Sequence, residues 1–238
     1  MMKVAVIGAG SIGFTRGIVR DILSVPEFRD HCEIALTDIS RLNLDMVYQL
    51  CKRDLESNGS KSRISATLNR REAVRHAHYV FCVVRVGGLE AFQTDIDIPL
   101  KYGIDQCIGD TLCAGGIMYG QRGIPVLLDF CKDISEVGAP GCKFITHVNP
   151  LAMNTWACSK YGHGVETIGL CHGVEYGWWQ IGEVLGIKKE DLDVMCAGIN
   201  HQTWYVSIKH KGRDMTGKIL AGFEKHPVDK LGDGHFGS

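Results

Sequence analysis

Short apolar runs alternate with stretches of helical apolar spacing along residues 1–170. The runs at residues 3–7, 33–37, 64–68, 79–84, 143–147 and 167–170 have the length of strands. The run at 79–84 is continuously apolar, as in parallel strands that are buried on both faces. Helical spacing occurs at 14–23, at 41–55 and within 117–137. This alternation predicts an α/β fold, a Rossmann-like doubly wound parallel sheet.

The pattern changes near Val194, where short strand candidates, notably residues 204–209, replace the alternation of strands and helices. The tail over residues 227–238 is polar and rich in glycine. We therefore predict a Rossmann-like domain over residues 1–195 and the beginning of a second, α+β domain over residues 196–238. The second domain looks cut short rather than complete.

Composition and charge exclude several classes of partner. The 238 residues carry a formal net charge of −1 and no basic stripe, so nucleic acid and membranes are not expected partners. No apolar run approaches the roughly 18 residues of a transmembrane helix, and a strand that starts at residue 3 leaves no room for a secretory signal. Ten scattered cysteines without paired spacing are typical of a reducing compartment. We predict a cytoplasmic protein whose cysteines are mostly buried.

One motif joins the first predicted strand to the first predicted helix. The strand runs directly into a Gly-x-Gly-x-x-Gly fingerprint, Gly8-Ala9-Gly10-Ser11-Ile12-Gly13. Gly8 permits the tight turn, Gly10 lets the backbone approach a pyrophosphate, and Gly13 permits close helix packing. Free N–H groups at the helix start, at Ser11 and Ile12, attract the phosphates. The alternative is a glycine turn in an α/β domain that binds no nucleotide.

An acidic residue distinguishes between two dinucleotides. The second predicted strand, residues 33–37, ends in Asp38, at the position where a carboxylate accepts the 2′-hydroxyl of the adenosine ribose. The same carboxylate would repel the 2′-phosphate of NADP. The sequence therefore predicts a domain that binds NAD.

Further polar and glycine positions fall at the carboxyl edge of the predicted sheet, where open α/β folds bind ligands. Gly87 lies in the loop after the strand at 79–84, and Asn149 follows the strand at 143–147. Asp110 precedes the pair Gly115-Gly116. The Asn149 carboxamide could bond sugar hydroxyls or a nicotinamide, and its alternative role is a turn with the following proline. The alternative role of Asp110 is to cap a helix.

Two later segments carry the residue types of a metal site. Cys171 and His172 follow the strand at 167–170, and His201 lies thirty residues further along. Thiolate and imidazole together bind borderline divalent ions such as Mn²⁺, Co²⁺, Ni²⁺ and Zn²⁺. The alternatives are an inert buried thiol and a histidine that only forms hydrogen bonds.

These motifs together resemble the family 4 glycoside hydrolases, closest to their α-galactosidase (melibiase) branch. The matching segments appear in family order over about residues 2–205: Gly8-Ala9-Gly10-Ser11, Asp38, Val86-Gly87-Gly88, Gly109-Asp110-Thr111, Gly115-Gly116-Ile117, Val148-Asn149-Pro150, Ala152-Met153-Asn154-Thr155-Trp156, Gly169-Leu170-Cys171-His172 and Ala197-Gly198-Ile199-Asn200-His201.

The resemblance implies a site and a chemistry. Cys171 and His201 would hold Mn²⁺, Asn149 and His172 would bind the sugar, and His172 is the candidate general acid. Asp110 would lie near the same pocket as a further catalytic candidate. NAD would oxidise the sugar at C3, a base would remove the C2 proton, and elimination would expel the aglycone. Water addition and re-reduction would follow. The assembly implied is a homo-oligomer, a dimer or a tetramer.

Two departures from the family keep alternatives open. Family members are roughly twice as long, and their C2 base is a tyrosine in the half that this chain lacks. In addition, Gly173 stands where α-galactosidases have serine, so the α-glucosidase and α-uronidase branches remain candidates. A different class of enzyme also remains open, a 2-hydroxy-acid dehydrogenase with Arg85 or Arg122 as the carboxylate clamp. A further alternative is a catalytically inactive NAD-binding module.

Overall fold

The computed structural model describes residues 1–225 and divides the chain into two compact units, Met1–Leu170 and a second unit that begins at Cys171. We predicted this division after residue 195, and it falls earlier. The difference arises because the helix over Gly173–Leu185 packs with the elements that follow it, through Ile181 against Ile208 and Ile219.

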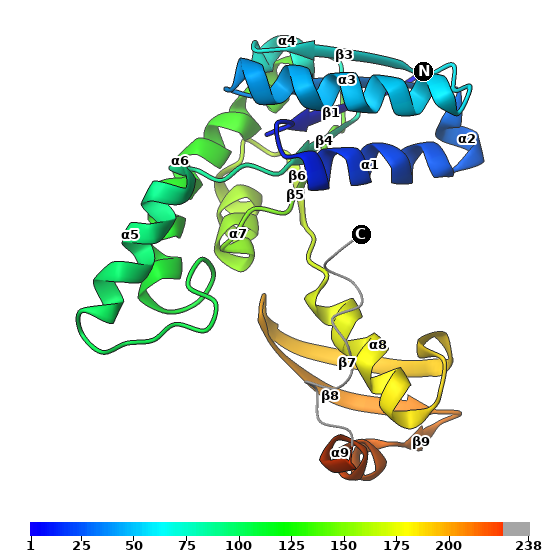
Figure 1. Ribbon diagram of the computed structural model, residues 1–238, viewed down its shortest axis with the longest axis vertical. Helices are drawn as coiled ribbons and strands as arrows, with labels where there is room; N and C mark the ends of the chain where they lie inside the picture. Colours follow the sequence, from blue (N-terminus) through cyan, green and yellow to red (C-terminus); the bar gives the residue numbers. More distant parts are fainter. Residues whose placement is uncertain (226–238) are drawn as a thin grey trace. The chain divides into compact units, whose positions relative to one another are not determined.

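The first unit is built on a six-stranded, wholly parallel sheet (Figure 1). Its strands are β1 (Met2–Ile7), β2 (Cys32–Thr37), β3 (Arg63–Thr67), β4 (Tyr79–Cys82), β5 (Lys143–Thr146) and β6 (Glu166–Gly169). The order β3-β2-β1-β4-β5-β6 is that of a Rossmann sheet, in which the strand order reverses between β1 and β4. The predicted fold class is therefore confirmed.

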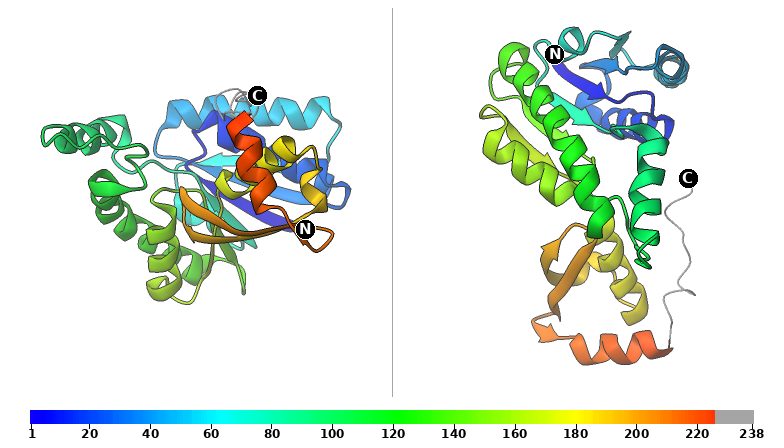
Figure 2. Two further views of the ribbon diagram at one scale, coloured as in Figure 1. Left: turned by 90° about the horizontal axis from the view of Figure 1, so that it is seen from below. Right: turned by 90° about the vertical axis from the view of Figure 1, so that its left-hand side faces the viewer.

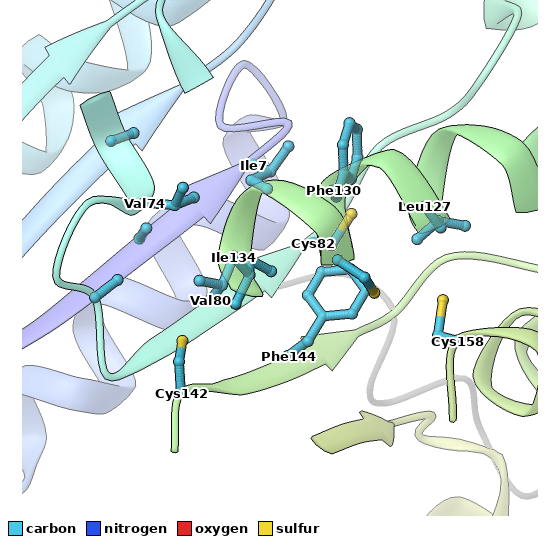
Figure 3. Packing of buried hydrophobic residues seen from close by; sticks show 14 of the residues in the cluster. Ile7, Val74, Val80, Cys82, Leu127, Phe130, Ile134, Cys142, Phe144 and Cys158 are labelled. Carbon is cyan, nitrogen blue, oxygen red and sulfur yellow. The ribbon is translucent and has the colours of Figure 1, made fainter. Parts of the chain in front are cut away.

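Helices cover both faces of this sheet (Figures 1 and 2). They are α1 (Ile12–Ser24), α2 (Pro26–Arg29), α3 (Arg41–Ser57), α4 (Arg70–Val74), α5 (Gly88–Leu100), α6 (Cys113–Val137) and α7 (Leu151–Tyr161). Successive side chains of β1 point to opposite faces, so Val6 packs with α1 and α3 while Ile7 packs with α4 and α6. Figure 3 shows the second of these cores around Phe144.

The cysteines confirm the expectation of a mostly buried set. All ten lie in the described part of the chain as free thiols, and six of them are buried: Cys32, Cys51, Cys82, Cys131, Cys142 and Cys158. Burial raises the pKa of the Cys82 thiol to about 12, so this side chain stays protonated and acts as a small apolar group.

The second unit is a small α+β arrangement, as predicted. Its elements are α8 (Gly173–Leu185), the 3₁₀ helix η1 (Lys189–Asp191), β7 (Leu192–Ile199), β8 (Gln202–His210), β9 (Arg213–Asp214) and α9 (Thr216–Lys225). The strands form an antiparallel sheet in the order β7-β8-β9, and α8 and α9 contribute to its core. The strand predicted at 204–209 lies within β8, and the tail at 227–238 lies outside the described residues.

Within residues 1–225, no helix is long and apolar enough to cross a membrane.

Candidate functional site

The turn between β1 and α1 is a tight glycine turn. Gly8 has φ +87°, and a Cβ there would lie 2.8 Å from Val84 Cγ1, so both the backbone and the space require glycine. A Cβ on Gly10 would lie 2.8 Å from Asn43 Cβ. Neither position therefore has room for a side chain.

The structure corrects the role predicted for Gly13. A Cβ at Gly13 would meet nothing within 4 Å, so this glycine does not mediate close helix packing. The reason is its place on the helix, since Thr15 and Val19 are the residues of α1 that face the core. Ser11 is the N-cap residue of α1 without a side-chain cap bond, and Ile12 is 55% exposed.

Asp38 holds this turn in place. Its Oδ2 accepts the N–H of Gly10 at 2.8 Å, and its Oδ1 accepts the N–H of Ser40 at 2.8 Å. Each carboxylate oxygen has a second lone pair and can accept a further bond. Asp38 is therefore a structural residue of the turn, and its role as a ribose acceptor stays a prediction.

A cavity of about 1160 Å³ lies at the carboxyl ends of the strands in the first unit. Its lining includes the glycine turn, Asp38, the loop after β4 and the residues after β5: Gly8, Gly10, Ser11, Asp38, Arg85, Gly87, Asp110, Tyr119, His147 and Asn149. Gly87 caps α5 with φ +89°, and a Cβ there would lie 2.6 Å from Ala91 Cβ. The residues predicted to bind the cofactor thus line the same cavity as Asp110 and Asn149.

Three polar side chains meet in this cavity. Asp110 Oδ2 accepts one bond from Arg85 Nη2 and one from Asn149 Nδ2, each at 3.3 Å. The Arg85 guanidinium lies 4.7 Å from the ring centroid of Phe92. Asp110 does not cap α6, because the N-cap residue is Leu112. Asp110 and Asn149 were predicted from separate motifs, and the structure brings them together.

Close backbone packing positions the loop that carries Asp110. A Cβ on Gly115 would lie 2.4 Å from Gly109 O, and a Cβ on Gly116 would lie 2.4 Å from the carbonyl carbon of Thr111. Only glycine at both positions allows the loop to fold back on the first turn of α6. The glycine pair is thus part of the site's support.

The Arg122 guanidinium is bonded to groups of the protein itself. Its Nη1 and Nη2 bond both oxygens of the buried Asp95, at 3.2 and 2.5 Å, and its Nε donates to Val86 O at 3.0 Å. The guanidinium edge that would clamp a carboxylate is therefore engaged. This observation weakens the hydroxy-acid dehydrogenase interpretation for Arg122.

Cys171 and His201 form a pair within the second unit. Cys171 Sγ lies 3.4 Å from His201 Nε2 and accepts the N–H of Gly173 at 3.4 Å. His201 is in the two-residue turn between β7 and β8 with φ +60°, a conformation that non-glycine residues rarely adopt outside turns and sites. His172 is the N-cap residue of α8.

The separation of the pair fits two ligands of one metal ion. At the bond lengths of zinc, about 2.3 Å to sulfur and about 2.1 Å to nitrogen, ligands at about 95–110° would be about 3.2–3.6 Å apart. The described residues contain no group of three or more Cys, His, Asp or Glu that could hold a metal. The pair can therefore supply two ligands and leave positions for other groups.

The comparison with known proteins identifies the family. The sequence model of the Family 4 glycosyl hydrolase family matches residues 3–186. The chain belongs to this family. This membership confirms the resemblance and favours a glycosidase over a hydroxy-acid dehydrogenase.

Individual relatives agree with this assignment. An alpha-galactosidase from Rhizobium meliloti (strain 1021) is 57% identical over 227 residues, which are 95% of this chain and 46% of that protein. A 6-phospho-alpha-glucosidase from gut microorganisms, solved with NAD and glucose-6-phosphate, is 29% identical with a TM-score of 0.83, covering 94% of this chain and 52% of that one. A 6-phospho-beta glucosidase from Thermotoga maritima, solved with manganese, NAD+ and glucose-6-phosphate, is 27% identical with a TM-score of 0.81, covering 96% of this chain and 54% of that one. The chain spans about half the length of these relatives.

Several residues that line the cavity were not predicted from the sequence. Tyr119 is buried there, and burial raises the pKa of its phenol, although Arg85 offsets part of that effect. Arg70 and Phe130 also line the cavity. Helical spacing placed Tyr119 and Phe130 on a helix, but it gave no signal that these residues face a ligand site.

Proposed function

We propose that this chain carries the cofactor-binding part of an NAD- and Mn²⁺-dependent α-galactosidase of family 4. The proposal rests on one observation: the glycine turn, Asp38, Asp110 and Asn149 line the same cavity. Support for the substrate comes from the 57% identity to an alpha-galactosidase.

The chain's own groups fit the dinucleotide. The N–H groups at the start of α1 and the glycine turn would bind the pyrophosphate, and Asp38 would accept the ribose hydroxyl with the lone pairs left by Gly10 and Ser40. In the second unit, Cys171 and His201 would bind the metal ion. When bound, the dinucleotide supplies reversible hydride transfer at sugar C3, and the metal supplies a Lewis acid for the neighbouring oxygens.

The polar residues would then bind the sugar and move protons. Asn149 donates its amide N–H to Asp110, so its carbonyl oxygen is directed to accept a sugar hydroxyl. Arg85 fixes the same carboxylate and keeps Asp110 in position. His172, beside the Cys171 and His201 pair, would protonate the oxygen of the leaving group.

At Gly173 the structure leaves room for the Cβ of the serine that α-galactosidases have at this position. This Cβ would lie 3.7 Å from Cys171 Sγ and 4.0 Å from His201 Cδ2, which is ordinary contact. The assignment to α-galactosides rests on the relative rather than on this residue, with α-glucosides and α-uronides as alternatives. A cytoplasmic homo-oligomer remains our prediction for the assembly.

The test is hydrolysis of p-nitrophenyl α-galactoside by the protein at the full length that its gene encodes. We expect release of p-nitrophenol only when NAD⁺, Mn²⁺ and a thiol reductant are all present. The matching α-glucoside and α-glucuronide serve as controls for specificity. Hydrolysis that is unaffected by removal of NAD⁺ and by chelation would contradict the proposal.

A further inference from the structure

Arg70 occupies an unusual position in the wall of the cavity. It is the first residue of α4, three residues after the end of β3, and it lines the cavity together with Leu68, Ile39 and Phe130. In a Rossmann sheet this side, beyond β1 toward β2 and β3, receives the adenosine half of a dinucleotide. Asp110 and Asn149 come from the opposite side, toward β4 and β5.

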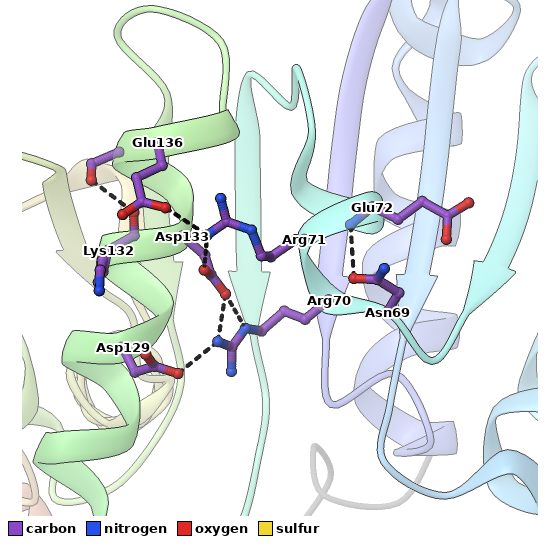
Figure 4. A network of polar contacts seen from close by, with 9 residues as sticks. Asn69, Arg70, Arg71, Glu72, Asp129, Lys132, Asp133 and Glu136 are labelled. Carbon is purple, nitrogen blue, oxygen red and sulfur yellow. Dashed lines mark hydrogen bonds and ion pairs between the residues drawn. The ribbon is translucent and has the colours of Figure 1, made fainter.

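The Arg70 guanidinium is fixed by three neighbours, of which Figure 4 shows Asp129 and Asp133. Its Nε donates to Asp133 Oδ2 at 2.6 Å, and its Nη2 donates to Asp129 Oδ2 at 2.6 Å. Its carbon Cζ lies 4.6 Å from the ring centroid of Phe130. One edge of the guanidinium is therefore engaged by carboxylates and one face by an aromatic ring.

The part of Arg70 that remains accessible is suited to a flat ring. The side chain is 29% exposed, and it lines the cavity. Ile39, at the same cavity, is fully exposed although it is apolar, so it gains burial only when something covers it. A planar cation and an apolar side chain at one cavity are the usual surfaces for a nucleobase.

We propose that Arg70 stacks on the adenine of the dinucleotide, opposite Ile39, and is a determinant of affinity for the adenosine half. The inference rests on the proposed NAD site and extends it to a residue that the fingerprint does not include. Asp129, Asp133 and Phe130 orient the guanidinium before the ligand arrives, which lowers the entropic cost of stacking.

A matched control lies next to Arg70 in the sequence. Arg71 also bonds Asp133, through Nη1 at 2.5 Å, and it bonds Glu136 at 2.6 Å. Arg71, however, is not one of the described residues that line the cavity. Loss of Arg71 thus removes a partner of Asp133 and leaves the cavity wall intact.

The experiment measures the binding of three probes to this 238-residue chain: NADH, ADP-ribose and nicotinamide mononucleotide. We expect Arg70→Met to weaken NADH and ADP-ribose about tenfold, with nicotinamide mononucleotide within twofold. Arg70→Lys keeps the charge without the planar group and should weaken the same two probes. Arg71→Met should leave all three affinities unchanged, and melting curves report whether each variant is folded.

The possible results separate the inference from the proposed function. Unchanged ADP-ribose affinity in Arg70→Met, an equal loss for nicotinamide mononucleotide, or an equal loss in Arg71→Met would each overturn the role of Arg70. If the unsubstituted chain bound no NADH, the proposed NAD site itself would be refuted, and the inference with it.

Discussion

At the scale of the residue, Asp38 has a role in the structure that its motif did not predict. The sequence assigns Asp38 to a ribose hydroxyl, whereas the structure shows that both of its oxygens already accept backbone N–H groups, from Gly10 and Ser40. Substituting Asp38 therefore alters the shape of the turn as well as the ligand contact.

The first prediction separates these two effects. Asp38→Ala should weaken NADH binding by roughly 100-fold, because it removes a charge-assisted acceptor and releases the turn. Asp38→Asn keeps one acceptor oxygen and should fall between the wild type and Asp38→Ala. Fluorescence titration with NADH measures both. Asp45→Ala, on the exposed surface of α3, is the control. NADH affinity that does not change in Asp38→Ala would refute the assignment.

The second prediction concerns the metal pair. Cys171→Ser and His201→Ala should each weaken Mn²⁺ binding at least tenfold, because each removes one ligand of the pair, while NADH affinity stays within twofold. Mn²⁺ binding is measured by electron paramagnetic resonance and NADH binding by fluorescence. Cys107→Ser, another exposed thiol, is the matched control. Full Mn²⁺ affinity in Cys171→Ser would exclude the pair as a metal site.

The third prediction uses the reactivity of the thiols. Burial raises the pKa of Cys51 to about 11 and that of Cys82 to about 12, so both remain protonated at pH 8 and unreactive. Iodoacetamide should then modify the exposed Cys107, Cys113 and Cys171, and Mn²⁺ should protect Cys171 alone. Peptide mass spectrometry reads out each site. Equal modification of Cys171 with and without Mn²⁺ would contradict metal binding there.

At the scale of the element, the strands were the most predictable part. The predicted runs and the observed strands of the first unit differ at their ends by at most two residues. Strands β1 and β2 are buried along most of their length, as their apolar runs predict, whereas the residues of the edge strands β3 and β6 are exposed or partly buried. Helices α5 and α7 were not predicted. Helix α5 starts at two glycines and contains Pro99, and α7 buries the polar Asn154 while exposing Trp156, so neither shows a clean apolar face.

The fourth prediction tests the support of the Asp110 loop. Gly116→Ala would place a Cβ against the Thr111 backbone, so it should lower the free energy of unfolding by about 2 kcal/mol and reduce activity. Gly17→Ala, in the interior of α1 with open space around it, is the matched control. That variant should be up to about 1 kcal/mol more stable than the wild type. Denaturant unfolding measures the stability of both variants. A Gly116→Ala protein as stable as the wild type would show that the packing is not tight.

At the scale of the whole molecule, the fold class followed from the sequence but the division into units did not. Residues 171–195 carry a helix and the start of a strand, which read equally well as more of the alternating pattern. Only the packing of α8 with β8 and α9 assigns them to the second unit. Likewise, the fingerprint, Asp38, Asn149, Cys171 and His201 were found from motifs, whereas the contacts of Arg70, Arg85 and Tyr119 required the fold.

The fifth prediction concerns the first unit. A protein of residues 1–170 should fold and bind NADH as tightly as the 238-residue chain, because all the described residues that line the cavity lie within this unit. Circular dichroism and fluorescence titration check the two properties. A folded first unit that fails to bind NADH would show that the second unit contributes to the cofactor site.

The most direct test of the proposed chemistry follows hydrogen at C2 of the sugar during turnover. The protein, at the full length that its gene encodes, is given an α-galactoside deuterated at C2, with NAD⁺ and Mn²⁺, and the released galactose is analysed by mass spectrometry. The account predicts that the deuterium is exchanged for solvent hydrogen, because oxidation at C3 makes the C2 proton acidic enough for a base to remove. Galactose that retains all of its deuterium would contradict the redox-coupled elimination.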